Sequence, residues 1–515
     1  MTSIIIIGGG VAGLTAAAQL SGRGLQPLLL EADPEWVGGR LRDAPAVEFE
    51  DGGQTWRFPA EHGVHGIWSP YRNLTALLER HSRMPTLIPS REETWIYGRG
   101  RTIRSAPIGS AIRSSPVPAP FHYLHMLLRP RFLNILTVRD FAALFRVEGS
   151  LLSALAIDPI AEGKALDGMS LADFTAGWSP TLRSLFAGLA RNALAAHPEA
   201  TPAAGFIAFL RFYTLLRRDA WGFGYLPGTG GACIAEPLAD IARAQGSDIH
   251  LGWRATRLDR RSEGWLVDCA GAGGDIQTHA ADRVVLALDA PAAARLLADS
   301  PATAAEAARM RFPQGVPTAI IRLWFNRAPR PVADSGICTG DFLMDNFFWL
   351  HRLQPAYRDW HAATGGSAVE THIYGPEEAL AQPDATLLAQ VVLDSYRAFP
   401  ELRGHLRHAV IQRNPATHTL FTPGDPAELL AVRTPWPGLV ACGDWVAHHN
   451  PAMYLERATT TAMVAANLLL EEQGLEPWPV QEHPAPEWLA GWLSSSLTRF
   501  RHAMIRRRRE KKLGA

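Results

Sequence analysis

A glycine-rich turn between an apolar strand and an apolar helix constrains this chain more than any other feature of its sequence. Ile4 to Ile7 are typical of a fully buried parallel strand, and Val11 to Leu20 have the composition of an apolar helix. The turn between them matches the pattern G-x-G-x-x-G, in which glycines permit a tight bend and the approach of a pyrophosphate to the helix N-terminus. We therefore predict a dinucleotide-binding βαβ unit, rather than a turn without a ligand. Its phosphate-binding residues would be Gly8, Gly10, Val11, Ala12 and Gly13.

An acidic residue follows this motif at the expected distance. Glu31 stands 18 residues after Gly13, at the end of the next expected strand, Pro27 to Leu30. A carboxylate there accepts hydrogen bonds from both hydroxyls of an adenosine ribose, and it would repel a phosphate on that ribose. The pattern thus argues against NADP.

Further α/β-like stretches recur later in the chain. One starts at Gly228 to Gly231 and continues through an expected helix, Ile234 to Ala244; a third begins at Gly438. Strands are expected at Ile249 to Leu251, Trp265 to Cys269 and Val284 to Leu288. We predict an α/β protein with a discontinuous Rossmann-like nucleotide-binding domain (residues 1–79, 222–299 and 417–475), an inserted α+β substrate domain (80–221 and 300–416) and a Pro/Trp-rich, then basic, C-terminal tail (476–515).

Two further motifs carry a resemblance to a known family. Gly38-Gly39-Arg40 follows Glu31, and Gly443-Asp444 ends an apolar strand that precedes the expected helix from Glu456 to Leu470. Together with the first motif they resemble the flavin amine oxidase and phytoene desaturase superfamily, over essentially the whole chain apart from the tail. The resemblance implies FAD as cofactor, held additionally by Gly38, Gly39, Arg40, Gly443, Asp444 and Glu456; an arginine can neutralise phosphate charge. Asp444 as a helix cap is the alternative.

Within that superfamily, Glu61-His62-Gly63-Val64-His65-Gly66 is most similar to carotene desaturases, especially the ring-aromatising, isorenieratene synthase-like type. The resemblance implies a long isoprenoid or carotenoid substrate, with Glu61 and His65 as candidate catalytic residues beside the flavin. A purely structural histidine is the alternative reading. His62 and His65 lack a third ligand at metal-binding spacing, so no metal is expected. His448 and His449 depart from the family's pattern.

The charge composition argues against nucleic-acid binding and suggests contact with a membrane surface. Lys+Arg and Asp+Glu each number 50, so no global basic face for nucleic acid exists. Eight basic residues against Glu510 between Arg499 and Lys512 give that segment a net charge of +7, suited to anionic membranes or to a solvated tail. The arginine-edged apolar segment Phe121 to Val147, which Pro130 should divide into two helices, suits a membrane interface or a packed core. Without a recognisable signal peptide or spanning segment, we expect a cytoplasmic, peripherally membrane-associated protein.

The aromatic residues and the scarcity of lysine bear on the reaction. Ten aromatic residues would line a substrate tunnel or fill the core: Trp324, Phe325, Phe342, Phe347, Phe348, Trp349, Phe206, Phe209, Phe212 and Tyr213. Many amine-oxidising relatives are similar in using a lysine near the flavin, but outside the tail this chain has only Lys164, in a loop-like stretch. Desaturation of a carotene is therefore preferred. A flavin amine oxidase, a squalene-pathway flavoenzyme, a polyene isomerase and a flavin-bound scaffold without turnover stay open, and no pattern identifies the electron acceptor.

Overall fold

A five-stranded parallel sheet forms the centre of the nucleotide-binding part. The computed structural model describes residues 2–330 and 333–513, without the side chains of residues 508, 509 and 511–513. The strands lie in the order β10-β2-β1-β14-β20, and all neighbours are parallel. Their bounds are Asp248–His250 (β10), Leu28–Leu30 (β2), Ile4–Ile7 (β1), Arg283–Leu286 (β14) and Leu439–Ala441 (β20). Segments from both ends and the middle of the chain thus build one Rossmann-like sheet, as the motifs predicted.

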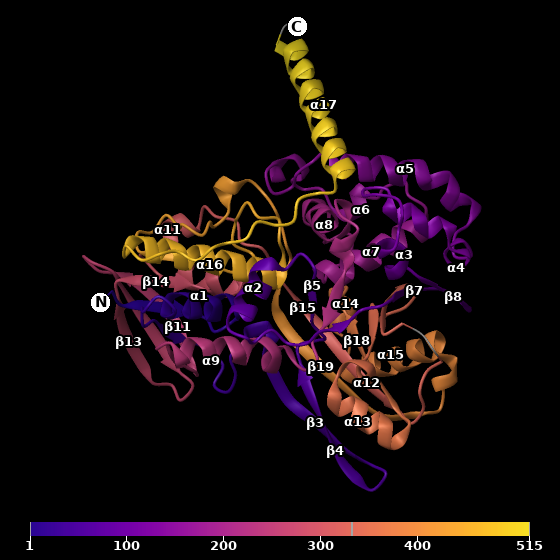
Figure 1. The fold of residues 1–515 in the computed structure, drawn as a ribbon, viewed down its shortest axis with the longest axis horizontal. Coiled ribbons are helices and arrows are strands. Elements are labelled where there is room, and N and C mark those ends of the chain that lie inside the picture. Colours follow the sequence, from indigo (N-terminus) through magenta and orange to yellow (C-terminus); the bar gives the residue numbers. More distant parts are fainter. Residues whose placement is uncertain (1, 331–332, 514–515) are drawn as a thin grey trace.

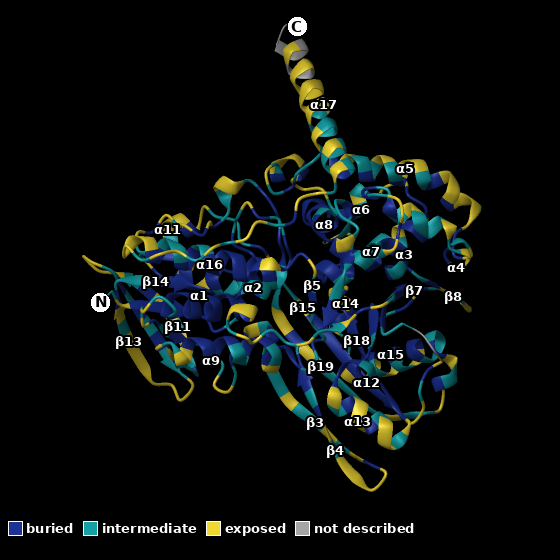
Figure 2. Ribbon diagram, in the orientation of Figure 1, coloured by how far each residue is buried: buried dark blue, intermediate teal, exposed yellow. Residues whose placement is uncertain are grey.

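Helices pack on this sheet and bury its apolar strands. α1 (Val11–Ser21) is buried along its whole length and packs against α16 (Tyr454–Glu472) and α9 (Glu236–Ala244), as Figures 1 and 2 show. α2 (Arg72–Arg80) packs on α16, and α10 (Ala290–Asp299) on β11. The expected helix Ile234 to Ala244 begins with a π-helical turn, Gly231–Ala235, before α9. Such turns are frequent at functional sites.

The chain also forms three smaller sheets. The expected strand Trp265 to Cys269 is present, but it belongs to an antiparallel sheet separate from the parallel one. This sheet contains β11 (Trp253–Arg260), β12 (Trp265–Gly271) and β13 (Ile276–Ala281). The other two are the hairpin of β3 (Asp43–Asp51) with β4 (Gln54–Glu61), and β5 (Gly66–Trp68), β9 (Phe223–Tyr225) and β6 (Ile88–Pro89). The end of β4 introduces the Glu61–His65 loop.

A seven-stranded mixed sheet has the order β19-β15-β18-β17-β16-β7-β8. Its strands are β19 (Leu406–Thr419), β15 (Gly315–Phe325), β18 (Ser367–Ile373), β17 (Asn346–Trp349), β16 (Ser335–Gly340), β7 (Glu93–Arg99) and β8 (Thr102–Pro107). β7 and β16 come from the two expected inserts and pair in parallel. This pairing is consistent with one substrate domain built from both inserts. Its boundaries, residues 80–221 and 300–416, stay a proposal. Helices of this region are α12 (Leu350–Leu353), α13 (Pro355–Thr364), α14 (Glu377–Leu380) and α15 (Asp384–Ala398).

Most of the aromatic residues considered for a tunnel fill cores instead. Trp324, Phe325, Phe342, Phe347 and Trp349 are buried in two clusters on the seven-stranded sheet, and Phe348 is half-buried. Phe206, Phe209, Phe212 and Tyr213 are buried in the main core. Their alternation along strands and helices places them against neighbouring apolar side chains.

The remaining helices form a layer beside the sheets. They are α3 (Gly109–Arg113), α4 (Pro130–Leu133), α5 (Val138–Leu155), α6 (Leu171–Phe174), α7 (Pro180–Leu194), α8 (Ala203–Leu210) and, elsewhere, α11 (Ala304–Ala307). The predicted break at Pro130 is present, but the segment forms three helical elements instead of the two expected. A 3-10 segment, His122–Leu128, precedes α4, which begins at Pro130, and α5 starts with a capping box of Thr137 and Asp140. Proline is tolerated in a first helical turn because its missing N–H would be unpaired there.

The C-terminal segment ends in a long helix, α17 (Trp488–Leu513), which projects from the body (Figure 1). Its first half is attached to the end of α5: Ser494 Oγ and Thr498 Oγ1 donate to the carbonyls of Leu155 and Ala156. Side chains of Arg508, Arg509, Lys511 and Lys512, half of the predicted basic cluster, lie outside the described residues. Among the helices described, none combines the length and apolar character needed to cross a membrane.

Candidate functional site

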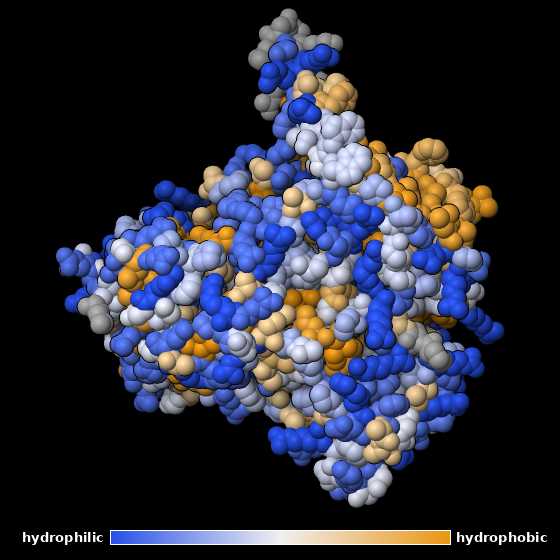
Figure 3. All heavy atoms as spheres, in the orientation of Figure 1, coloured by the Kyte–Doolittle hydropathy of each residue, from blue (hydrophilic) through white to orange (hydrophobic). Residues whose placement is uncertain are grey.

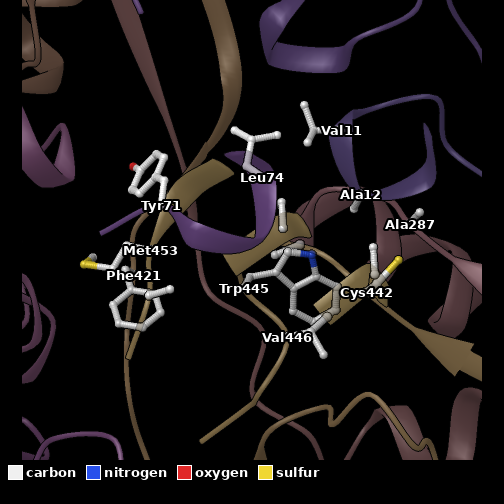
Figure 4. Close-up of a cluster of buried hydrophobic side chains, with 14 of the residues drawn as sticks. Val11, Ala12, Tyr71, Leu74, Ala287, Phe421, Cys442, Trp445, Val446 and Met453 are labelled. Atoms are coloured by element: carbon white, nitrogen blue, oxygen red, sulfur yellow. The ribbon is translucent and has the colours of Figure 1, made fainter. Parts of the chain in front are cut away.

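The first glycine motif forms a turn that admits no side chains at two positions. Gly8 has φ +106°, and a Cβ there would lie 2.7 Å from the carbonyl oxygen of Ala287. A Cβ on Gly13 would lie 1.9 Å from the carbonyl oxygen of Gly8, so α1 packs directly on the turn. Figure 4 shows Val11, Ala12, Ala287 and Cys442 in the buried cluster around the ends of α1, β14 and β20. The glycines thus serve the close backbone packing that a dinucleotide site requires.

The N-terminus of α1 is open toward a ligand. Gly10 is the N-cap residue, no side chain caps the helix, and the first turn contains no acidic residue. A Cβ on Gly10 would meet nothing within 4 Å. The first backbone N–H groups of a helix have no intrahelical acceptor and carry its positive dipole end. This end of α1 therefore fits a pyrophosphate.

Glu31 lies beside this turn and is already oriented by backbone groups. Its Oε2 accepts a hydrogen bond from Gly9 N at 2.6 Å, and its Oε1 accepts one from Asp33 N at 2.8 Å. Burial raises the pKa of Glu31, although both hydrogen bonds oppose that effect. A carboxylate has about four lone-pair positions, so Glu31 retains acceptor capacity for ribose hydroxyls.

The second glycine pair lies directly on the first motif. Gly38 N donates to the carbonyl of Gly9 at 2.7 Å, and a Cβ on Gly39 would be 3.3 Å from Gly10 Cα. Both residues have positive φ, +112° and +57°, which glycine adopts at low cost. Arg40, next in the chain, forms an ion pair with Asp444, Nη2 to Oδ2 at 2.7 Å.

Gly443-Asp444 follows β20 and is held by helix α16. Gly443 has φ +148° and donates from its N to Thr461 Oγ1 at 3.0 Å. Asp444 is buried, and its Oδ1 accepts a hydrogen bond from Thr419 Oγ1 at 3.1 Å. The alternative of a helix cap finds no support, since its recorded partners are Arg40 and Thr419. The turn after β20 thus meets the glycine turns after β1 and β2.

Glu456 has a structural role that its motif did not reveal. Oε1 accepts from Asn73 N at 2.8 Å and from Asn73 Nδ2 at 3.0 Å, while Oε2 accepts from Leu74 N at 3.1 Å. These donors lie in the first turn of α2, so Glu456 caps that helix from α16. Burial raises the pKa of Glu456 to about 7. Glu456 therefore holds the start of α2 in place.

The loop after β4 brings Glu61 and His65 together. Glu61 Oε2 accepts from Gly230 N at 2.8 Å and lies 3.1 Å from His65 Nδ1, and its Oε1 accepts from Gln354 Nε2 at 3.0 Å. Glu61 is buried, whereas the His65 side chain is 22% exposed. The carboxylate orients the imidazole, leaving Nε2 of His65 for a ligand or a proton.

A buried ionic network fixes this loop to the seven-stranded sheet. Val64 N donates to Glu370 Oε1 at 2.7 Å, and Arg322 Nε donates to Glu370 Oε2 at 2.8 Å. Burial opposes ionisation of Glu370, but Arg322 and His372 beside it lower its pKa to about 2. Arg322 Nη2 also donates to the carbonyl of Glu61 at 2.7 Å. The sheet thus holds the loop through its backbone, at Glu61 and Val64.

Three polar side chains lie near this loop, and the sequence did not indicate that they come together. His62, His418 and Tyr454 each bury a polar atom (Nε2, Nε2 and OH) that has no partner within the described part of the chain. Burial lowers the pKa of His62, and that of His418 to about 4, with neighbouring Arg40 acting in the same direction. The rings of His418 and Tyr454 are 6.1 Å apart. Unpaired buried polar atoms require a partner, and a bound cofactor is the simplest one.

Two expectations about metals and lysine can be compared with the geometry. The residues described contain no group of three His, Cys, Asp or Glu side chains able to hold a metal ion. The Lys164 side chain is 77% exposed and pairs with Asp425, Nζ to Oδ2 at 3.1 Å. Lys164 therefore lies in a surface ion pair and has no recorded contact with the glycine turns or the Glu61–His65 loop.

The sequence matches a known protein family and two curated relatives. The profile of the family described as flavin containing amine oxidoreductase matches residues 11–470. The chain belongs to this family. It is 27% identical to a carotenoid phi-ring synthase of Streptomyces griseus over 491 residues, which cover 92% of this chain and 88% of that protein. A carotenoid phi-ring synthase of Chlorobaculum tepidum is 30% identical over 167 residues, 32% of this chain and 26% of that protein.

Solved structures show the same fold. Cyclohexylamine oxidase from Brevibacterium oxydans has a TM-score of 0.65 at 17% identity, with 92% of this chain and 99% of that chain covered. Putrescine oxidase bound to putrescine has a TM-score of 0.63 at 14% identity, covering 91% and 99%. At this identity the likeness concerns the fold alone, which is the flavin amine oxidase fold.

The protein is an FAD-dependent oxidoreductase of this family. The residues present fit the cofactor. α1 has an open, uncapped N-terminus, and Glu31 retains acceptor capacity. Atoms of His62, His418 and Tyr454 that have no partner among the described residues lie near the Arg40–Asp444 pair. The resemblance inferred from the motifs is confirmed, including the similarity to carotenoid ring-modifying enzymes.

Proposed function

We propose that this enzyme oxidises the end ring of a carotenoid to an aromatic ring. The observation that carries the proposal is the similarity to a carotenoid phi-ring synthase, which extends over 92% of the chain. The surface position of Lys164 weighs against the lysine-assisted amine oxidation considered as an alternative.

The cofactor-binding residues we propose are those of the three turns and their neighbours. Val11, Ala12 and the glycines Gly8, Gly10 and Gly13 would face the pyrophosphate, and Glu31 the adenosine ribose. Gly38, Gly39 and Arg40 would continue the phosphate contact. Gly443 and Asp444 would lie near the flavin-bearing half, with Glu456 supporting α2 beside them.

Bound FAD supplies an acceptor for hydride from a carbon centre. We propose that Glu61 and His65 orient the ring beside the flavin or take up the proton that leaves with each hydride. Glu61 Oε2 lies 3.1 Å from His65 Nδ1, so the carboxylate would orient the imidazole with Nε2 directed to the proton. Burial of Glu61 and of the sheet behind it excludes water from this side.

We also propose peripheral membrane contact, because carotenoids are held in lipid. Arg499, Arg506 and Arg507 lie on α17, whose exposed apolar side chains include Trp492 and Phe500. An apolar and cationic helix surface suits an anionic bilayer interface.

The test is expression in a bacterial host that accumulates β-carotene, followed by chromatography and mass spectrometry of the extracted pigments. The proposal expects a product of unchanged carbon number that has lost hydrogen in pairs and has an aromatic end ring. A product of equal mass would indicate isomerisation instead. Unchanged pigment in the presence of FAD-loaded protein would overturn the proposal.

A further inference from the structure

An apolar cavity lies in the helical layer, apart from the glycine turns. Its volume is about 500 Å³, within the range of roughly 300–1,000 Å³ that is common for small-molecule sites. α5, α7 and the 3-10 segment His122–Leu128 supply most of its walls, and the end of α8 and Trp221 close it. Its wall residues include Leu144, Leu151, Leu182, Leu185, Leu189 and Leu210.

The cavity opens on an apolar surface. Leu124, Phe141 and Phe145 line the cavity and are also exposed, Phe145 to 90%. Leu128 and Val138, exposed to 74% and 86%, come from the same segment. Figure 3 shows hydrophobic side chains gathered at the upper right, where Figure 1 places α4 and α5. Large apolar side chains concentrated at one place mark a site for an apolar ligand or surface.

The polar side chains of the wall already have partners. Tyr123 OH donates to Glu148 Oε2 at 2.7 Å, Thr214 Oγ1 lies 3.2 Å from His122 Nε2, and Trp221 Nε1 donates to Glu93 Oε2 at 3.1 Å. Glu148 Oε1 has no partner within the described residues and is free to accept a hydroxyl. The remaining wall is hydrocarbon, so the ligand must be predominantly apolar.

A series of contacting aromatic rings lies between the inner end of the cavity and the candidate flavin site. Trp221 of the wall lies 5.7 Å from Trp68, which lies 4.9 Å from Tyr213. Tyr213 is 6.3 Å from Tyr454, whose ring is in turn 6.1 Å from that of His418. Tyr213 belongs to the π-helical turn Arg211–Leu215, which also supplies Thr214 and Leu215 to the cavity wall. A π-helical turn often marks a functional position in a helix.

The charged residues around the opening of the cavity are compatible with entry of a ligand from a membrane. Arg131, Arg139 and Arg146 are exposed among the apolar residues of this segment. Between residues 121 and 147 the only acidic residue is Asp140, which is buried in the capping box of α5. Arginine can place its aliphatic part on an apolar surface and its charge at phosphate groups.

We propose that this cavity is a binding site for one end of an isoprenoid hydrocarbon, which enters from the lipid phase between Leu124 and Phe145. The rings of Trp68 and Tyr213 separate this cavity from the candidate flavin site, so the cavity holds part of the apolar chain outside the reaction centre. The choice of an isoprenoid rests on the proposed function.

The experiment measures β-carotene retained by the FAD-loaded, full-length protein after incubation with β-carotene in nonionic detergent micelles and gel filtration. Leu144→Trp replaces an aliphatic side chain on α5 with a bulky indole that fills part of the cavity, and Leu189→Trp does the same from α7. Leu152→Trp is the matched control, because Leu152 lies on α5 outside the cavity wall. FAD content per protein reports correct folding of each variant, and conversion of β-carotene is measured in parallel.

We expect Leu144→Trp and Leu189→Trp to lower carotene retention at least tenfold at unchanged FAD content, and Leu152→Trp to leave it unchanged. Equal retention by all variants would overturn the cavity site, whether or not the wild type converts carotene. Retention that depends on Leu144 without conversion would support the cavity and overturn the proposed ring oxidation. A wild type that retains no carotene would overturn the cavity site.

Discussion

Arg40 and Asp444 are joined by an ion pair of 2.7 Å, although Arg40 follows β2 near the start of the chain and Asp444 follows β20 near its end. Asp444 is buried and Arg40 is 29% exposed, so one face of the guanidinium is left toward solvent or a ligand. The pair fixes the turn after β2 to the turn after β20. It thereby closes the candidate cofactor site around two distant segments of the chain.

Replacement of Arg40 tests this relationship. Arg40→Ala removes the partner of a buried carboxylate and a candidate phosphate ligand. A charge-assisted hydrogen bond contributes about 2 kcal/mol, so FAD binding should weaken roughly 30-fold. The measurements are the FAD content of the purified protein and the dissociation constant for FAD added back to the apoprotein. Arg42→Ala is the control, because Arg42 pairs with Asp33 at the surface; equal losses in both variants would contradict a specific role.

Replacement of Glu31 tests the ribose contact. Glu31→Ala removes the acceptor that Gly9 N and Asp33 N already orient. We expect FAD affinity to fall by about 2 kcal/mol, which is again roughly 30-fold. Glu31→Gln should lose less, because one oxygen remains. Glu35→Ala, an exposed neighbour, should retain its flavin. Unchanged flavin content in purified Glu31→Ala would disprove the ribose role.

Replacement of Glu61 tests the reaction centre. Glu61→Gln keeps the shape of the side chain but removes the carboxylate that lies 3.1 Å from His65 Nδ1. We expect kcat for carotene oxidation to fall about 100-fold, within the usual range for loss of acid–base assistance. FAD content should be maintained. Glu48→Gln, an exposed substitution on β3, serves as control. A lower unfolding temperature with unchanged kcat would indicate a purely structural carboxylate.

The buried Glu456 predicts a pH dependence of stability. Burial raises its pKa from 4.5 to about 7, so the folded protein binds this proton more tightly than the unfolded chain does. The contribution of this group is therefore greatest below pH 4.5 and falls by about 3 kcal/mol as the pH rises to 7. Glu456→Gln cannot ionise. Its stability relative to the wild type should improve over that interval, as measured by denaturant unfolding.

The control for this pH effect is Glu471→Gln, an exposed change on the same helix, whose difference from the wild type should stay constant with pH. A constant difference for Glu456→Gln as well would show that its carboxylate is not the group responsible.

Deletion of residues 499–515 tests the proposed membrane contact. Without this segment, sedimentation with vesicles containing anionic lipid should fall at least several-fold, since each basic residue near such a surface contributes about 1 kcal/mol. Neutral vesicles should show little difference between the two proteins. FAD content reports that the body of the protein is intact. Equal sedimentation of both proteins with anionic vesicles would contradict a role of this segment as an anchor.

Local sequence was sufficient for the cofactor-binding fold. Ile4–Ile7, the glycine turn and α1 are neighbours in the chain, and their structure follows from buried strand composition and from the space that Gly8 and Gly13 leave free. The strand expected at Trp265 to Cys269 is present, but its antiparallel pairing with β11 could not be read from the sequence, because a single apolar strand does not specify its partner.

Tertiary structure alone decided which distant residues meet. His418 carries no motif, yet β19 brings it near His62 and Arg40; Glu456 lies on α16, yet it caps α2. The apolar cavity likewise needs α5, α7 and α8 together, and its wall residues are indistinguishable in sequence from core leucines. The sequence by itself determined the turns and the cofactor, because these depend on backbone sterics between neighbouring residues. The site and the cavity depend on packing between segments that are hundreds of residues apart, which no local pattern encodes.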